Sequence, residues 1–499
     1  MEPLLLGVEV GTSAVKAVVY DLEGVERSTA RRPVALMTPQ PGWAEQDAAA
    51  LWRALLAVLH EAAAESAAHG QIAVLALAAQ AGSIVPVDRQ GAPLAPLITW
   101  LDQRAAPLVA EWCRQGRDVH IREVSGWHPH GGLGLAILAW LTRNSPQLAA
   151  HAAQYLDVQG FLLQHLIGWS VTDYSEAAEL LLFDRSVRAW SPELCALAGI
   201  GIGQLGAVIP AGTPAGRLLP AVATAAGLPP DVLVVAGGQD QCCAALGMGI
   251  LAPGELMLAS GTAWVLTALT SSPKLEQLPP GMDLNFHVVP AVYTASQLLG
   301  GFGAVVDWWL TVLYPDSAER YTALDAALQS SGSNDLYFLP LGGSVQAGHA
   351  PGGFLGLRLN HTRAEIMAAL CQGIGFEVRW ALDALAAAHL PAARLWMSGG
   401  ATHSPHWPAL LAAMTGTPVQ VAHGANWPAR GAALLAGTGA GLLGDLQAAV
   451  VRWRLPLATV EPDAHAAARY GARFAGYQAA VQRVAGLTGG EPADTPAEA

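Results

Sequence analysis

The chain has 499 residues, of which 52% are apolar, and a formal net charge of −13 at pH 7. Its length favours two or three domains, and an acidic chain without a cluster of Lys and Arg argues against a nucleic-acid-binding surface. No apolar run reaches the roughly 18–20 residues of a membrane span, and no basic segment precedes an apolar one at the N-terminus, so we predict no membrane partner and a cytoplasmic location.

The chain opens on a strand, a tight turn and a return strand. Residues 4–10 are an apolar run that contains Glu9, residues 11–14 read Gly-Thr-Ser-Ala, and residues 15–21 form the return strand with Lys16 near its start. Such a turn can offer backbone N–H groups and hydroxyls to a phosphate, a carboxylate to Mg²⁺ and an amine to a terminal phosphoryl group. The same pattern fits an ordinary β-hairpin with a polar turn, so the stretch alone does not decide between them.

Strands and helices alternate after this hairpin. Asp47 is placed to cap a helix, and the apolar strand at 72–79 ends at Gln80. A second apolar strand runs into Gly-Gly-Gln-Asp, which ends at Asp240, and a helix follows from Gln241. The predicted elements of this half are a helix at 47–68, strands at 72–79, 84–88 and 232–236, and a mainly helical stretch at 105–200 with helices at 133–143 and 155–166.

The second half repeats the opening pattern. A strand at 255–259, a Ser-Gly-Thr-Ala turn at 260–263 and a return strand at 264–269 again form a hairpin with a Gly-Thr turn. Two similar α/β halves predict an internal duplication, with a ligand that carries several phosphates held between them. The remaining predictions are helices at 304–313, 363–388, 407–414, 429–437 and 464–486, strands at 336–339, 395–398 and 419–421, a Gly-rich loop at 342–353, and a mobile end from residue 489.

Eight short motifs, taken in order, resemble the FGGY family of carbohydrate kinases, and the similarity is greatest to its xylulokinase members. The motifs lie at 7–13, 43–47, 100–104, 172–177, 236–241, 260–262, 353–357 and 399–401. The resemblance implies an α/β fold of the duplicated actin/hexokinase/Hsp70 type, with two α/β domains and an active-site cleft between them. It further implies an N-terminal kinase domain over 1–245, a C-terminal nucleotide-binding domain over 246–455, and a C-terminal helix with a flexible tail over 456–499.

The same resemblance assigns the catalytic and phosphate-binding residues, with ATP and Mg²⁺ as cofactors. Asp240 matches the base that takes a proton from the sugar hydroxyl, and its place at a helix N-terminus predicts that it stays ionised. As an isolated residue it could instead be a helix cap. Glu9 and Asp240 match the metal ligands, and the first phosphate turn is matched by Gly11, Thr12, Ser13 and Lys16.

On the nucleotide side, the resemblance points to glycines and two polar residues. Gly261 and Thr262 match the second phosphate turn, and Gly303 lies in a loop that approaches the nucleotide. The turn beside the adenosine is matched by Gly399 and Gly400, and contacts to adenine by Asp307 and Ser404. Each glycine taken singly could be a simple turn residue.

On the sugar side, a small sugar or polyol is the implied partner. Trp100 and Asp102 match the family's Trp-x-Asp element, in which the ring packs on C–H groups and the carboxylate accepts hydroxyl hydrogen bonds. Gln80 matches the Gln of the family's substrate strand, and Gln241, next to the base, is a further expected substrate contact, whereas we expect Arg104 to form an ion pair at a helix start. Core packing is the alternative for Trp100.

The chain departs from the family pattern at several positions. Glu9 stands where the family has Asp, Gln80-Ala81-Gly82-Ser83 replaces Gln-Met-His-Gly, Ala263 replaces a Ser, and residues 343–347 replace a Gly-Glu-Arg-Thr-Pro loop. The sugar site thus differs more from the pattern than the ATP site does.

The predicted activity is transfer of a phosphoryl group from ATP to a small sugar, with D-xylulose to D-xylulose 5-phosphate as the first choice. Gluconate, glycerol and ribulose are alternative substrates. A nucleotide-binding sugar sensor with little turnover, and more remotely an assembly ATPase, are alternatives of other classes. The five cysteines lack metal-site spacing, so reduced thiols and no zinc are expected, and a homodimer is expected from the family alone.

Overall fold

The computed structural model describes residues 2–315, 319–330, 335–340, 352–390, 392–424 and 426–487. The chain divides into two compact units. Unit 1 comprises Met1–Leu251, Leu284–Thr294 and Asn426–Leu455, and unit 2 comprises Ala252–Asp283, Ala295–Ala425 and Pro456–Ala499.

Unit 1 is built on a six-stranded sheet in the order β13-β14-β5-β1-β2-β3. The opening hairpin is confirmed: β1 and β2 pair antiparallel, with Glu9 directly opposite Lys16. β5 lies parallel to β1 on its other side. The strands are β1 (Pro3–Val10), β2 (Ala14–Tyr20), β3 (Glu26–Pro33), β5 (Gln71–Ala79), β13 (Pro214–Arg217) and β14 (Leu233–Gln239).

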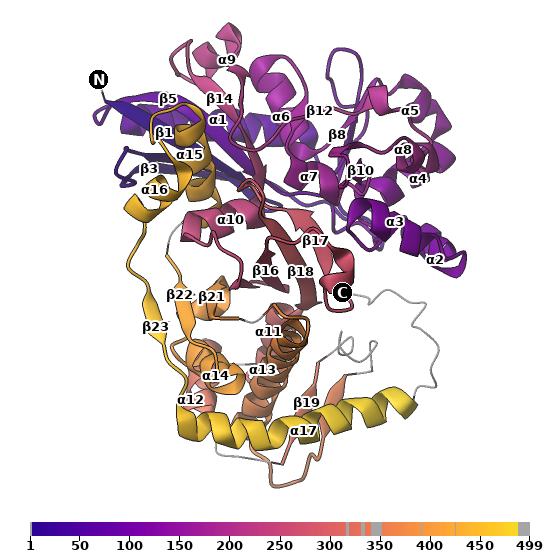
Figure 1. The fold of residues 1–499 in the computed structure, drawn as a ribbon, viewed down its shortest axis with the longest axis vertical. Coiled ribbons are helices and arrows are strands. Elements are labelled where there is room, and N and C mark those ends of the chain that lie inside the picture. The colour runs from indigo at the N-terminus through magenta and orange to yellow at the C-terminus, as the bar shows by residue number, and fades with distance from the viewer. Residues whose placement is uncertain are drawn as a thin grey trace. The chain divides into compact units, whose positions relative to one another are not determined.

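Helices cover both faces of this sheet (Figure 1). Alternate residues of β1 point to opposite faces: Leu4, Leu6 and Val8 belong to the core that contains α1 and α6, whereas Leu5 belongs to the core with α10 and α15. The helices of the unit are α1 (Ala48–Ser66), α2 (Ala106–Arg114), α3 (Arg117–Ser125), α4 (Gly134–Asn144), α5 (Pro146–His151), α6 (Val158–Ile167), α7 (Tyr174–Glu179), α8 (Pro192–Ala198), α9 (Pro220–Ala225), α10 (Asp240–Met248), α15 (Trp427–Gly439) and α16 (Leu446–Arg452).

α15 fits closely against β1 because glycine lies at the contact. A Cβ on Gly7 would lie 1.8 Å from the carbonyl oxygen of Ala429, so any side chain there would force the helix away from the sheet.

The compact units differ from the expected domain ranges 1–245 and 246–455. Residues 426–455, which contain α15 and α16, pack in unit 1, as do residues 284–294. The C-terminal helix α17 (Ala464–Leu487) belongs to unit 2.

Unit 2 repeats the sheet order of unit 1. Its strands belong to a seven-stranded sheet in the order β23-β22-β21-β15-β16-β18-β17, with β15 and β16 antiparallel and β21 parallel to β15; the first six positions correspond to those of the sheet in unit 1. β15, β16 and β21 thus take the places of β1, β2 and β5, which confirms the predicted duplication. The strands are β15 (Glu255–Ser260), β16 (Trp264–Thr270), β18 (Tyr293–Gly300), β21 (Arg394–Ser398), β22 (Val419–Ala422) and β23 (Ala458–Val460).

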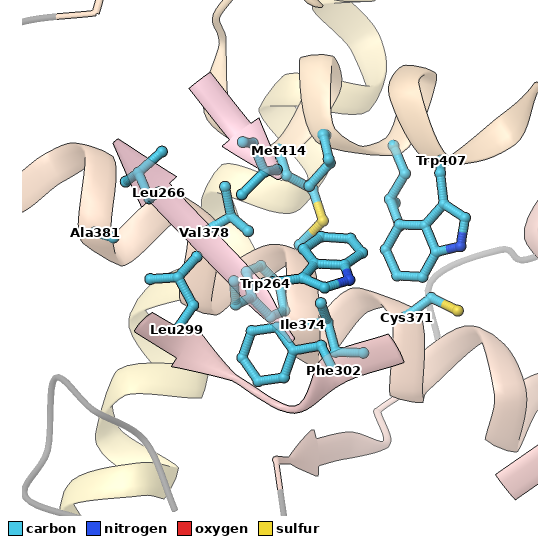
Figure 2. Packing of buried hydrophobic residues seen from close by; sticks show 14 of the residues in the cluster. Trp264, Leu266, Leu299, Phe302, Cys371, Ile374, Val378, Ala381, Trp407 and Met414 are labelled. Atoms are coloured by element: carbon cyan, nitrogen blue, oxygen red, sulfur yellow. The ribbon is translucent and has the colours of Figure 1, made fainter. Parts of the chain in front are cut away.

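The core of unit 2 surrounds Trp264 at the start of β16. This side chain is 1% exposed, and its ring meets Phe302 and Trp407 edge-on at centroid distances of 5.9 and 5.1 Å, with Ile374 and Met414 close by (Figure 2). The helices of the unit are α11 (Phe302–Leu313), α12 (Arg320–Ser330), α13 (Arg363–Ala387), α14 (His406–Thr415) and α17, and a hairpin is formed by β19 (Tyr337–Leu339) and β20 (Gly353–Leu355).

Smaller elements complete the description. The remaining strands are β4 (Glu45–Gln46), β6 (Val85–Val87), β7 (Leu97–Ile98), β8 (Gln154–Leu156), β9 (Val171–Thr172), β10 (Phe183–Asp184), β11 (Ala189–Trp190), β12 (Ala207–Val208) and β17 (Asp283–Phe286). The helix expected at 155–166 is wrong at its start, because Tyr155 and Leu156 pair with β6 and Asp157 caps α6. The expected loop at 343–347 and the mobile end from 489 lie outside the described residues. Among the described helices, none has the length and apolar composition needed to cross a bilayer.

Candidate active site

The first turn of unit 1 carries an ion pair between its two strands. Lys16 Nζ lies 2.9 Å from Glu9 Oε2, as the pairing of these residues across β1 and β2 requires. Both side chains are about a quarter exposed (25% for Glu9 and 26% for Lys16). The hairpin therefore presents one carboxylate and one amine beside the Gly11-Thr12-Ser13 turn, and Ser13 is itself exposed.

A closed ring of hydrogen bonds joins this turn to the proposed sugar residues. Thr12 Oγ1 donates to Gln80 Oε1 (2.8 Å), Gln80 Nε2 donates to Gln46 Oε1 (2.7 Å), and Gln46 Nε2 donates to the carbonyl of Thr12 (2.7 Å). Trp100 Nε1 also donates to Thr12 Oγ1 at 3.1 Å. The structure thus brings Thr12, Gln80 and Trp100 together. It adds Gln46, which sequence reasoning missed as a site residue although it lies in the motif at 43–47.

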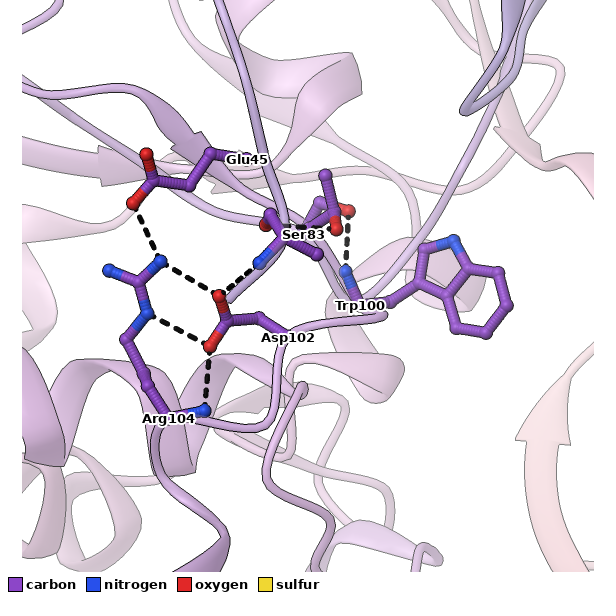
Figure 3. Close-up of polar contacts among 7 residues, drawn as sticks. Glu45, Ser83, Trp100, Asp102 and Arg104 are labelled. Atoms are coloured by element: carbon purple, nitrogen blue, oxygen red, sulfur yellow. Dashed lines mark hydrogen bonds and ion pairs between the residues drawn. The ribbon is translucent and has the colours of Figure 1, made fainter. Parts of the chain in front are cut away.

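Asp102 holds a loop together (Figure 3). Its Oδ1 accepts from the backbone N–H and Nε of Arg104, and its Oδ2 from Ala44 N–H and Arg104 Nη2. A carboxylate has about four acceptor positions, and Asp102 is 0% exposed. We therefore revise the expectation that Asp102 binds substrate hydroxyls, because its acceptor positions are already used by the protein.

Arg104 forms the ion pair expected of it, with a second carboxylate added. Its Nη2 lies 2.7 Å from Asp102 Oδ2 and 2.6 Å from Glu45 Oε1. The guanidinium carbon stands 3.6 Å from the ring centroid of Trp43. The side chain is 4% exposed, so this is a buried pair, and through Asp102 it fixes the loop that carries Trp100.

Asp240 is the first residue of α10, where β14 ends. Its pKa is raised from the ordinary carboxyl value to about 7, mainly by burial and also by the negative charge of Glu9, although the N–H of Gln241 donates to it and lowers the pKa. The effect of the helix N-terminus on Asp240 is thus outweighed in the protein alone, since desolvation and a like charge raise its pKa more than one backbone hydrogen bond lowers it.

Glu9 and Asp240 fit the demands of a magnesium ion. Mg²⁺ is commonly held by one or two carboxylates, with waters and phosphate oxygens completing its shell. The charge of Glu9 acts on Asp240, so a cation placed between them would relieve a repulsion already present. The described residues contain no group of three or more His, Cys, Asp or Glu arranged to hold a metal by themselves.

A cavity of about 550 Å³ lies within unit 2. This is within the usual range of small-molecule sites, about 300–1,000 Å³. Six of the expected nucleotide residues line it, and the seventh, Gly399, directly precedes the lining residue Gly400 in the sequence. The lining residues are Ser260, Gly261, Thr262, Trp264, Gly303, Val306, Asp307, Tyr321, Leu324, Asp325, Gly400, Ala401, His403, Ser404 and Trp407.

The glycines at this cavity are needed for two different reasons. A Cβ on Gly303 would lie 2.2 Å from the carbonyl oxygen of Gly261, and one on Gly399, which has a φ of +93°, would lie 2.7 Å from the carbonyl carbon of Ser260. These two glycines let α11 and the turn after β21 approach the second hairpin turn. By contrast, the nearest atom to a Cβ on Gly400 would be 3.9 Å away, so packing within the protein does not require glycine there.

Two polar pairs line the cavity. The Tyr321 hydroxyl donates to Asp307 Oδ1, and the Ser404 hydroxyl donates to Asp325 Oδ1. Sequence reasoning missed Tyr321 and Asp325, which come from α12, a helix that it did not predict.

Comparisons with known proteins point to one family over nearly the whole chain. Residues 4–247 match the model of the FGGY family of carbohydrate kinases, N-terminal domain, and residues 256–440 match the C-terminal domain of that family. The chain is 28% identical to the L-xylulose/3-keto-L-gulonate kinase of Escherichia coli K12 over 97% of both proteins. It is 30% identical to the glycerol kinase of Gloeobacter violaceus over 88% of this chain and 89% of that one.

A solved structure shows the same fold. The xylulose kinase from Rhodospirillum rubrum superposes with a TM-score of 0.89 at 25% identity, covering 97% of this chain and 99% of that one. The expected fold, two α/β domains of the duplicated ATPase type, is therefore confirmed. The chain belongs to the FGGY family of carbohydrate kinases.

Proposed function

We propose that the protein transfers the γ-phosphoryl group of ATP to a hydroxyl of a small sugar, with D-xylulose to D-xylulose 5-phosphate as the first choice. The observation that carries the proposal is that the charge of Glu9 acts on Asp240, with both residues at positions of the family's motifs for a metal ligand and a base. Similarity to kinases named for xylulose supports the substrate. Gluconate, glycerol and ribulose remain alternatives.

In the proposed reaction, the residues of unit 1 hold and activate the sugar. Trp100 and Gln80 present a ring and an amide to it, Gln241 contacts it beside the base, and Asp102 with Arg104 keeps Trp100 in place. Asp240 accepts the proton of the attacking hydroxyl while the new O–P bond forms and the bond from the γ-phosphorus to the bridging oxygen breaks, releasing ADP.

The remaining site residues would hold the phosphates and the nucleoside. Glu9 and Asp240 would hold Mg²⁺, which neutralises phosphate charge when bound. The first turn, Gly11 to Ser13 with Lys16, and the second turn, Gly261 with Thr262, would bind phosphate oxygens through N–H groups and hydroxyls. In the cavity of unit 2, the open position at Gly400 leaves room for a ribose or base, and Asp307 and Ser404 offer polar contacts to adenine. The homodimer and the cytoplasmic location stay predictions from the sequence.

ADP release tests this proposal. The assay compares pentuloses, polyols and sugar acids, using the wild type, Asp240→Asn and the control Asp231→Asn, which alters an exposed aspartate of the same unit. Sugar-dependent ADP release that is lost in Asp240→Asn and kept in Asp231→Asn supports the kinase. Sugar binding without sugar-dependent ADP release would instead support the sensor, for which Glu9 and Ala263, both departures from the family pattern, are the motivation.

A further inference from the structure

Gln46 lies between the first phosphate turn and Gln80, and its amide is used at both ends. Its Oε1 accepts a hydrogen bond of 2.7 Å from Nε2 of Gln80, and its Nε2 donates at 2.7 Å to the carbonyl oxygen of Thr12. The side chain is 0% exposed. Because Gln46 is enclosed in this way, its effect on a ligand has to pass through the residues that it holds.

The backbone of Gln46 is fixed to the segment that carries Trp100. Gln46 belongs to β4 and pairs antiparallel with Leu97 of β7, and the chain runs from β7 directly to Trp100. The amide of Gln46 reaches from this segment to Thr12, which lies 34 residues earlier in the chain. Gln46 therefore ties the segment that carries Trp100 to the phosphate turn.

The hydrogen bonds of the closed ring all run in one direction. The Thr12 hydroxyl donates to Gln80, Gln80 donates to Gln46, and Gln46 donates to the Thr12 carbonyl. Turning the Gln46 amide over would place its NH₂ group against that of Gln80 and its oxygen against the Thr12 carbonyl oxygen. The residue at this position must therefore accept on one side and donate on the other, as a glutamine amide does and a methionine side chain does not.

The Thr12 hydroxyl holds two of the residues proposed to contact the sugar. Its Oγ1 accepts from Trp100 Nε1 at 3.1 Å while it donates to Gln80 Oε1 at 2.8 Å. A hydroxyl carries one hydrogen, and here that hydrogen goes to Gln80. Since Gln46 holds the carbonyl of the same threonine, the directions of the Gln80 amide and the Trp100 indole both depend on it.

We propose that Gln46 is a positioning residue for the sugar: through the hydrogen-bond ring it fixes the directions in which Gln80 and Trp100 face the substrate. A side chain that binds a ligand keeps its productive direction only when its own partners hold it. This inference rests on the proposed function and deepens it, because it assigns a role in sugar binding to a residue that acts through others.

Two kinds of variant test the inference. Gln46→Met keeps the length of the side chain and removes both hydrogen bonds. Thr12→Val keeps the shape of the side chain and removes the hydroxyl, whereas Thr12→Ser keeps the hydroxyl. The control is Gln154→Met, because Gln154 is a partly buried glutamine of unit 1 whose Nε2 donates to Ser170 and whose Oε1 accepts from Gln164. Its replacement removes the same kinds of bond from residues outside the proposed site.

Sugar binding is measured apart from turnover. Isothermal titration without nucleotide identifies the pentulose, polyol or sugar acid that the wild type binds most tightly and measures its affinity for each variant. ADP release with saturating ATP gives kcat and the KM for that compound, and the melting temperature shows whether each variant is folded. Gln46→Met is also made in a Gln80→Met background, since a residue that acts through Gln80 has little effect once Gln80 is replaced.

We expect Gln46→Met and Thr12→Val to weaken binding at least tenfold and to raise KM by a similar factor, while Thr12→Ser and Gln154→Met change both less than threefold. In the Gln80→Met background, Gln46→Met should weaken binding less than threefold. Equal losses in the two backgrounds, binding by Gln46→Met within threefold of the wild type, or equal binding by Thr12→Val and Thr12→Ser would overturn the inference, as would a wild type that binds no compound of the panel.

The proposed kinase fails in a different way. Sugar binding without sugar-dependent ADP release would contradict the kinase, while the binding ratios would still decide the role of Gln46. If Gln46→Met does not fold, the comparison of Thr12→Val with Thr12→Ser decides the role of the hydrogen-bond ring.

Discussion

Replacing Arg104 by Met should strongly destabilise unit 1. Arg104 is 4% exposed and Asp102 is 0% exposed; the guanidinium donates to both Asp102 oxygens, at 2.9 and 2.7 Å, and to Glu45 at 2.6 Å. Removing one partner of a buried pair leaves an uncompensated charge and costs about 3–5 kcal/mol. Met also lacks the guanidinium that stands over the Trp43 ring, so we expect a loss of about 3–5 kcal/mol, the range for removing one partner of a buried pair.

Urea-induced unfolding, with hydrogen exchange in α2 and the loop before it, measures this loss. The control is Arg143→Met, because Arg143 is 54% exposed and lies 3.9 Å from Glu111, and such a surface pair contributes within about 0.5 kcal/mol. Adding Asp102→Asn to Arg104→Met should cost less than Asp102→Asn alone, since the two residues share the interaction. A loss in Arg104→Met no larger than that in Arg143→Met would refute the reasoning.

Three other variants probe separate features. Gly400→Ala should raise the KM for ATP without changing the melting temperature. Gly303→Ala should lower the melting temperature, because its Cβ would lie 2.2 Å from a carbonyl oxygen. The same KM and the same melting temperature in both variants would contradict this contrast. Burial lowers the pKa of His287 from 6.5 to about 3, so its stabilising effect is complete above pH 6.5 and declines as the pH falls toward 3. When the pH is lowered from 7.5 to 4.5, the free energy of unfolding, measured by chemical denaturation, should therefore fall by about 2–3 kcal/mol less in His287→Gln than in the wild type. An equal fall in both proteins would contradict the lowered pKa of His287. Glu9→Asp should need more Mg²⁺ for half-maximal activity, since the side chain is one methylene shorter and draws its carboxylate back from the position at which its charge acts on Asp240; an unchanged Mg²⁺ titration would argue against Glu9 as a metal residue.

The duplicated sheet could be predicted because its signal is local. Each hairpin shows an apolar strand, a Gly-Thr turn and a return strand, so β1–β2 and β15–β16 follow from the sequence. β3 was missed because it is an edge strand with several charged and polar residues, whose alternation resembles a loop. The place of residues 426–455 in unit 1 was also beyond the sequence, because it depends on the fit of α15 against Gly7.

The site residues show the same division between local and long-range information. Motif order was enough to select Thr12, Gln80 and Trp100, which share hydrogen bonds. It did not reveal that the carboxylate of Asp102 is fully used within the protein, nor that burial raises the pKa of Asp240. Both depend on surroundings supplied by distant segments, and no spacing in the sequence encodes them.

The stoichiometry of sugar phosphate to ADP tests the central claim most directly. With the best sugar of the panel, ATP and Mg²⁺, mass spectrometry quantifies both products for the wild type and for Asp240→Asn. We predict one sugar phosphate for each ADP in the wild type and neither product above background in a folded Asp240→Asn protein. ADP accompanied by inorganic phosphate without sugar phosphate, or an equal yield of sugar phosphate from Asp240→Asn, would contradict the account.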